Sequence, residues 1–224
     1  MTAGGGTASQ TAPRGSIFTA IQRYPSFRML WIGTVATNLG QWMQNIALSW
    51  QMLVLTDSAF MVGMIAFAAG IPYLVVALPA GALIDRVDER KLLMVAQWCA
   101  MIVAAALAAL ILLGKAEPWH LIVAAGLNGT IMAVNQMVRQ TLVPALVSRE
   151  HMANAVSLNS AGSNAMRIIG PSIAGVVIGA FGAGVCFVLQ AVALVGALLT
   201  TVRIKPIEHL RAGIAPGGIL DGWH

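Results

Sequence analysis

Charge is scarce in this chain of 224 residues. Charged residues make up 9% of it, whereas an average soluble domain carries about 25%. Hydrophobic residues make up 58%, and the mean hydropathy is +0.80. This composition excludes an ordinary soluble domain and indicates a polytopic membrane protein. The pI near 9.9 is then explained by basic loop residues that set membrane topology, so no nucleic-acid partner is expected.

Cysteine and the sequence signatures of enzymes are also nearly absent. Cys99 and Cys186 both lie in apolar runs, which gives no disulfide framework and no metal-ligand spacing, so both are interpreted as packing residues. There is no G-x-S-x-G, H-E-x-x-H or P-loop motif, and the histidines stand alone in loops. We therefore expect no enzymatic activity, no cofactor and no metal site.

The N-terminus lacks the apolar core of a secretory signal peptide. Residues 1–16 are mainly Gly, Thr, Ala, Ser and Gln. We expect residues 1–26 to form a disordered cytoplasmic lead that ends in a short interfacial helix at 17–24.

Long apolar runs, by contrast, are abundant. Six of them reach the roughly 20 residues that cross a bilayer, and they cover 27–54, 58–84, 91–113, 119–140, 153–180 and 184–203. The predicted fold class is therefore an all-α membrane protein, with a six-helix transmembrane domain over 27–203 and a cytoplasmic tail over 204–224. Pro79 and Pro171, each beside small residues in the second helix of a triplet, suggest two inverted three-helix repeats.

Basic residues fall almost entirely on one side of the predicted membrane. With the N-terminus inside, eleven of the thirteen Lys and Arg residues lie on the inner side, Lys115 alone lies outside, and Arg167 falls within a span. The positive-inside rule then predicts that both chain ends are cytoplasmic. No Asp or Glu is embedded in a span, so the sequence leaves the coupling ion of any transport open.

Two spans carry polar stripes at helical spacing. Each stripe follows the spacing i, i+4, i+7 and i+11, which lies on one helix face. The residues are Thr34, Asn38, Gln41 and Asn45 in the first span, and Asn128, Met132, Asn135 and Arg139 in the fourth. One interpretation is the wall of a water-filled cavity that contacts substrate. The alternatives are interhelical hydrogen bonding for the first stripe and simple packing for the fourth.

Arg167 is the only ionisable residue deep inside a predicted span. Insertion scales give a cost of about 2.5–3.5 kcal/mol for Arg at a helix centre, so the side chain is expected to face protein or water. Ser160 and Asn164 precede it on the same face and complete the predicted substrate pathway. The alternative is that Arg167 snorkels to the inner membrane surface.

Several motifs together resemble one transporter family. They are the start of the first span (Phe27 to Gly33), the charged hairpin Gly81 to Lys91, the Arg139-Gln140-x-x-x-Pro144 and Asn154-Ala155 segments, and Arg167-x-x-Gly170-Pro171-x-x-x-Gly175. As a set they resemble the N-terminal half of a major facilitator superfamily transporter, in its drug and siderophore exporter branch. The similarity runs from about residue 17 to residue 211.

The resemblance implies a function and a location. The chain is expected to contribute to secondary-active efflux of lipophilic or siderophore-like small molecules across a bacterial-type inner membrane. It implies a cytoplasmic gate formed by Gly81, Asp85, Arg86, Arg90 and Arg139. It also implies a helix-packing motif formed by Gly170, Pro171, Gly175 and Gly179, of which Gly175 and Gly179 form a GxxxG pair.

Family members have twelve helices in two halves, whereas this chain provides six predicted spans. The expected partners are therefore the lipid bilayer, a small lipophilic substrate, and a C-terminal half or a second half-transporter. The alternative is a truncated membrane fragment that does not transport, or a half that works only after pairing with another.

Overall fold

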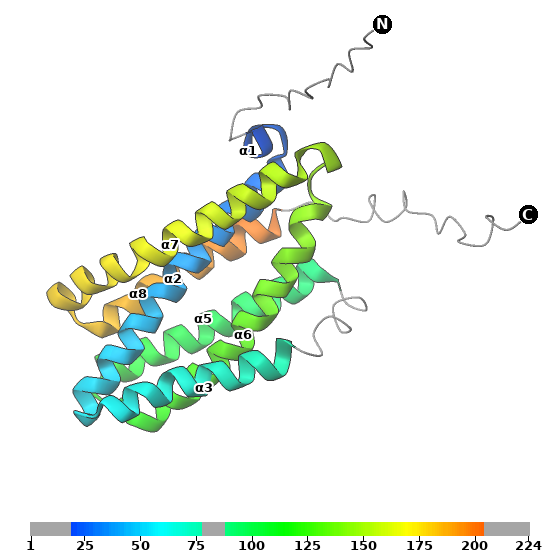
Figure 1. The fold of residues 1–224 in the computed structure, drawn as a ribbon. Helices are drawn as coiled ribbons and strands as arrows, with labels where there is room; N and C mark the ends of the chain where they lie inside the picture. The colour runs from blue at the N-terminus through cyan, green and yellow to red at the C-terminus, as the bar shows by residue number, and fades with distance from the viewer. Residues whose placement is uncertain (1–18, 78–87, 204–224) are drawn as a thin grey trace, which may run out of the picture.

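The computed structural model describes residues 19–77 and 88–203, and this part of the chain is helical apart from short connections (Figure 1). The elements are α1 (Thr19–Arg23), α2 (Pro25–Thr56), α3 (Ala59–Ala77), α5 (Glu89–Leu112), α6 (Pro118–Ala145), the 3-10 helix η1 (Arg149–His151), α7 (Met152–Phe181) and α8 (Ala183–Val202). Residues 1–18 of the predicted lead, the predicted tail, Pro79 and the predicted gate residues Gly81, Asp85 and Arg86 lie outside the described residues, whereas α1 lies within the short helix predicted at 17–24.

The helix ends follow from local chemistry. Pro25 starts α2, where a missing N–H costs nothing, and Asp57 ends it in the left-handed region at φ 46°. The Asp88 carboxylate caps α5 by accepting from the backbone N–H groups of Arg90 and Lys91 at 3.0 and 3.2 Å. Glu117 and His120 form a capping box at the start of α6. These residues end or start the helices at short connections, after which the next helix begins.

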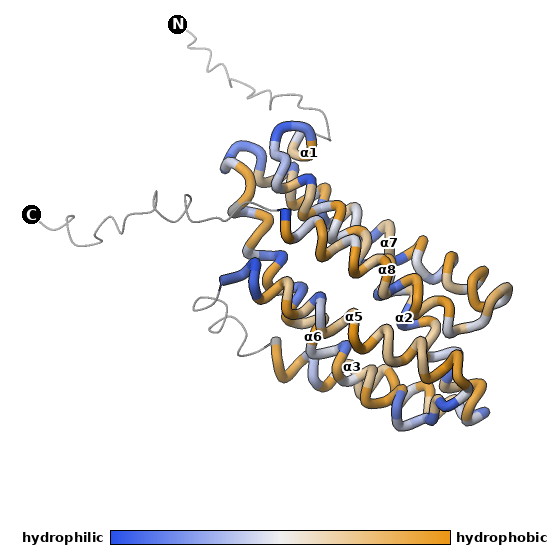
Figure 2. Tube along the Cα trace, turned by 180° about the vertical axis from the view of Figure 1, so that it is seen from behind, coloured by the Kyte–Doolittle hydropathy of each residue, from blue (hydrophilic) through white to orange (hydrophobic). Residues whose placement is uncertain are grey.

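Five of the described helices are long and apolar enough to cross a membrane, namely α3, α5, α6, α7 with η1, and α8. Figure 2 shows them apolar over most of their length and more polar near their ends. The 32-residue α2 is not among the five, although its length suffices. Its amides and hydroxyls lower its hydropathy, so α2 depends on neighbouring helices to satisfy its polar groups.

The helices of the first predicted triplet (α2, α3 and α5) pack mainly on those of the second triplet (α6, α7 and α8). The second helix of each triplet lies against the first helix of the other triplet, because α3 packs on α6 and α7 packs on α2. The third helices follow the same rule, since α8 packs on α2 and α5 packs on α6, while α5 and α8 also meet each other. In Figure 1, α2, α7 and α8 form one layer and α3, α5 and α6 the other. Exchanging the triplets therefore leaves this set of five packed pairs unchanged.

Glycines allow two of these contacts to be close. A Cβ at Gly129 of α6 would lie 2.0 Å from the carbonyl oxygen of Ala69 in α3, and one at Gly170 of α7 would lie 2.5 Å from the Trp42 Cβ in α2. A Cβ at Gly175 or Gly179, the GxxxG pair, would meet no atom of another helix within 4 Å in the described part of the chain. The helix contact predicted for them is therefore not made among these residues.

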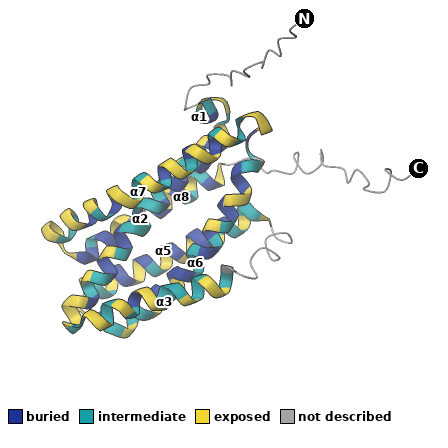
Figure 3. Cartoon of the chain, viewed as in Figure 1, coloured by how far each residue is buried: buried dark blue, intermediate teal, exposed yellow. Residues whose placement is uncertain are grey.

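The buried side chains form two clusters along the bundle. One includes Met52, Leu121 and Phe187, and the other includes Phe27, Leu93 and Leu142. By contrast, α3 and α7 bury few of their residues inside the bundle (Figure 3). These two helices therefore have faces that nothing in the described part of the chain covers.

Candidate substrate pathway

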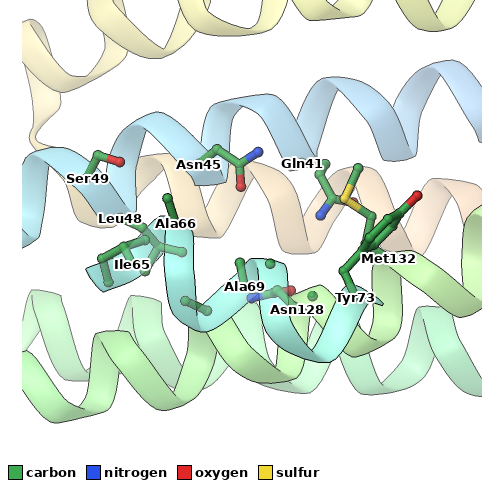
Figure 4. A pocket seen from close by; sticks show the side chains of 13 residues that line it. Gln41, Asn45, Leu48, Ser49, Ile65, Ala66, Ala69, Tyr73, Asn128 and Met132 are labelled. Atoms are coloured by element: carbon green, nitrogen blue, oxygen red, sulfur yellow. The ribbon is translucent and has the colours of Figure 1, made fainter. Parts of the chain in front are cut away.

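A cavity of about 430 Å³ opens between α2, α3 and α6 (Figure 4). Its lining residues are Gln41, Asn45, Leu48 and Ser49 from α2, Ile65, Ala66, Ala69, Gly70 and Tyr73 from α3, and Ala125, Asn128, Gly129 and Met132 from α6. Figure 4 shows Gln41, Tyr73 and Met132 gathered at one end and Ser49, Leu48 and Ile65 at the other. The lining offers amides, hydroxyls and a thioether on an apolar background, without a charged side chain.

Four residues of the predicted pathway meet in this cavity: Gln41, Asn45, Asn128 and Met132. Their place in a transport pathway stays a prediction, but the structure brings two residues of each polar stripe to one cavity. Tyr73 also lines the cavity, and the sequence reasoning missed it. A phenol inside an otherwise apolar span was the available signal, because a buried tyrosine hydroxyl usually needs a polar partner.

Other residues of the same stripes contact neighbouring helices instead of the cavity. Arg139 is 5% exposed, and its guanidinium donates to the hydroxyl of Thr34 and, at 3.1 Å, to that of Thr37. Asn38 donates from Nδ2 to the Ser163 hydroxyl of α7 at 3.4 Å. Thr34, Asn38 and Arg139 thus lie outside the cavity and connect α2 to α6 and α7.

Asn135 also lies outside the cavity. It is buried, and its Nδ2 donates to the Ile131 carbonyl of its own helix at 3.3 Å, while its Oδ1 has no partner among the described residues. An unsatisfied buried oxygen is costly, so this position favours a water or a ligand donor.

The pair Gln44 and Gln190 was not foreseen from the sequence. Gln190 of α8 donates from Nε2 to the Oε1 of Gln44 in α2, and both side chains are at least 97% buried, at 3% and 1% exposure. Gln44 widens the polar face of α2 in the sequence, but nothing local indicates which helix carries its partner.

The predicted residues of α7 form an exposed polar face. Ser160, Asn164 and Arg167 are all exposed, and the guanidinium carbon of Arg167 lies 5.5 Å from the ring centroid of Trp42 in α2. Pro171 lies inside α7 next to Gly170. Arg167 thus lies near the middle of α7 beside the Trp42 indole, and its place in a transport pathway stays a prediction.

Arg90 of α5, a predicted gate residue, contacts the C-terminal end of α8. Its Nε donates to the Thr201 carbonyl at 3.3 Å, and its Nη2 donates to the Val202 carbonyl. A cation at the carbonyl end of a helix is electrostatically favourable. Its role in a gate stays a prediction, since the rest of the predicted gate apart from Arg139 lies outside the described residues.

Comparison with known proteins decides the family. The transmembrane secretion effector family matches residues 17–224, which is nearly the whole chain. The chain belongs to this family of major facilitator superfamily transporters. The family predicted from the sequence motifs is thereby confirmed, and the chain is a multi-pass membrane protein of that family.

The chain is also similar to the staphyloferrin A transporter of Staphylococcus aureus (strain NCTC 8325 / PS 47). The two are 34% identical over 155 residues, which is 69% of this chain and 39% of that protein. The chain thus spans well under half the length of this curated relative.

Proposed function

We propose that this chain is the N-terminal six-helix half of a secondary-active exporter of lipophilic or siderophore-like small molecules. The observation that carries the proposal is the cavity between α2, α3 and α6, where neutral amides and a thioether stand on an apolar wall. Such a lining suits a largely apolar molecule with a few hydrogen-bonding groups. The similarity to a staphyloferrin A transporter supports the siderophore-like part of the proposal.

The proposal includes six spans in two inverted repeats, with both chain ends in the cytoplasm. The exchanged packing of α3 on α6 and α7 on α2 supports the repeats. The excess of basic residues on one side supports the orientation. In Figure 1, α1, η1 and the end of α8 lie at one end of the bundle, which fits an even number of crossings.

A second half completes the cavity in this proposal. The exposed faces of α3 and α7 flank the helices that carry the polar stripes, and polar groups left against lipid are costly. The second half is either the C-terminal half of a longer transporter or a second half-transporter. The gate role of Asp85, Arg86, Arg90 and Arg139 belongs to the same proposal, because it closes the two halves against each other.

Ligand binding tests the cavity. The purified chain in nanodiscs is titrated with a lipophilic fluorescent dye, and Gln41→Leu and Asn45→Leu are expected to weaken binding several-fold. Gln136→Leu is the matched control, because it removes an exposed amide of α6 that does not line the cavity. Equal losses in all three variants, or no loss in the first two, would contradict the proposal.

Transport tests the need for a second half. Vesicles that contain only this chain are expected to show no saturable, gradient-driven efflux of the same dye. Efflux by the chain alone would overturn the proposal that a different second half is needed, and would favour a homodimer. Failure of efflux after addition of the complementary half would favour the alternative of a fragment that does not transport.

A further inference from the structure

Arg167 is held in place by a contact one turn further along its helix. Because Gly170 has no side chain, the Cβ of Trp42 reaches the α7 backbone there, 2.5 Å from where a glycine-replacing Cβ would lie. The Trp42 indole then extends beneath Arg167, whose guanidinium carbon lies 5.5 Å from the ring centroid. Cation–π stacking fixes a guanidinium over the ring and leaves its N–H edges free.

The positive charge of Arg167 has no acidic partner among the described residues. In the described part of the chain no carboxylate lies within ion-pair distance of it, and α2 and α7 contain no Asp or Glu at all. Arginine does not lose its proton in proteins. A fixed cation midway along a 30-residue apolar helix therefore needs an anion or water from outside this set of helices.

The surroundings of Arg167 suit an oxyanion. Ser160 and Asn164 are exposed on the same face of α7, two turns and one turn before it, and offer neutral donors. The polar face of α2 reaches the same region, because Asn38 bonds to Ser163 of α7. A planar carboxylate could accept two parallel bonds from the free guanidinium edge.

We propose that Arg167, supported on Trp42, binds a carboxylate or similar oxyanion of the transported molecule. This inference rests on the proposed function and narrows its substrate class. The substrate is an amphiphilic acid, with an apolar or neutral polar body for the cavity and an anionic group for Arg167. An acidic residue of a second half is the competing partner for the same guanidinium, and the experiment below separates the two.

Two probes that differ only in charge test the inference. The purified chain in nanodiscs is titrated with 1-pyrenebutyrate and with its methyl ester, and binding is followed by energy transfer from tryptophan to pyrene. Arg167→Gln is expected to weaken binding of the acid about tenfold, which corresponds to about 1.4 kcal/mol, and to leave binding of the ester unchanged. Arg167→Lys is expected to restore binding in part, because it keeps the charge without the planar fork.

The control is Arg149→Gln, which removes the same charge from an exposed site in η1. It is expected to bind both probes as the parent does, and comparison in identical nanodiscs cancels partition into lipid. Unchanged acid binding in Arg167→Gln, with both probes still bound, would overturn the inference and leave the proposed function standing. Failure of the parent chain to bind either probe would contradict both the inference and the proposed function.

Self-association distinguishes the competing partner. Loss of chain–chain or half–half association in Arg167→Gln, without any change in the affinity for either probe, would assign the guanidinium to an acid of the second half and overturn the ligand assignment.

Discussion

Arg139 of α6 donates to the hydroxyl of Thr37 in α2 at 3.1 Å, and no carboxylate accompanies this buried cation among the described residues. Thr34 provides the second hydroxyl. A buried cation bonded only to neutral acceptors is stabilised less than one in an ion pair. Loss of either hydroxyl is therefore expected to reduce stability. The junction of α2 and α6 therefore depends on two threonines that a composition-based description would treat as ordinary helix residues.

Thr37→Val is expected to destabilise the chain by about 1–3 kcal/mol, because it leaves a buried charged donor without its acceptor. Thermal unfolding in detergent measures the change. Thr141→Val is the control, since the Thr141 hydroxyl donates only to the Val138 carbonyl of its own helix. Equal melting temperatures for the two variants would mean that the bond between Arg139 and Thr37 contributes nothing measurable.

Gly129→Ala is expected to be destabilising by about 1–3 kcal/mol or more, because its Cβ would meet the Ala69 backbone and force α3 away from α6. The same change should reduce dye binding, since Gly129 lines the cavity. In Gly175→Ala the Cβ meets open space, so a gain of about 0.5–1 kcal/mol from helix propensity is expected instead. Loss of stability in both variants would show that α7 packs against something at Gly175.

The Gln44 and Gln190 pair is expected to behave non-additively. Gln190→Met should cost about 1–3 kcal/mol, because it leaves the buried Gln44 amide without a partner, whereas Gln44→Met combined with Gln190→Met should be nearly neutral. A double-mutant cycle of unfolding free energies measures the coupling. Simple addition of the two single losses would argue that the amides do not depend on each other.

The proposed orientation predicts where an impermeant maleimide reacts in intact cells. A cysteine at the exposed position 115, in the turn between α5 and α6, is expected to be labelled from outside. A cysteine at the exposed position 149, in η1, is expected to react only after the membrane is permeabilised. The parent chain with Cys99 and Cys186 provides the background signal. The opposite pattern would reverse the topology.

The sequence by itself determined the helices and the family. Apolar runs between short polar turns fix where a chain must be helical in a membrane, because every backbone N–H and C=O needs an internal partner there. The helix ends came within a few residues of prediction where both were described, as at 91–113 against Glu89–Leu112. Helical spacing also placed Gln41 and Asn45 on one face, and both line the cavity.

Only the tertiary structure decided which helices meet and what each polar residue faces. Periodicity is a property of one helix, whereas partners depend on packing between helices distant in sequence. The first stripe looked uniform, yet Thr34 bonds to Arg139, Asn38 to Ser163, and Gln41 and Asn45 face the cavity. Different helices contact successive parts of α2, so residues on a single face reach different neighbours. Trp42 beneath Arg167 is the same kind of result, because it depends on a glycine more than a hundred residues further along the chain.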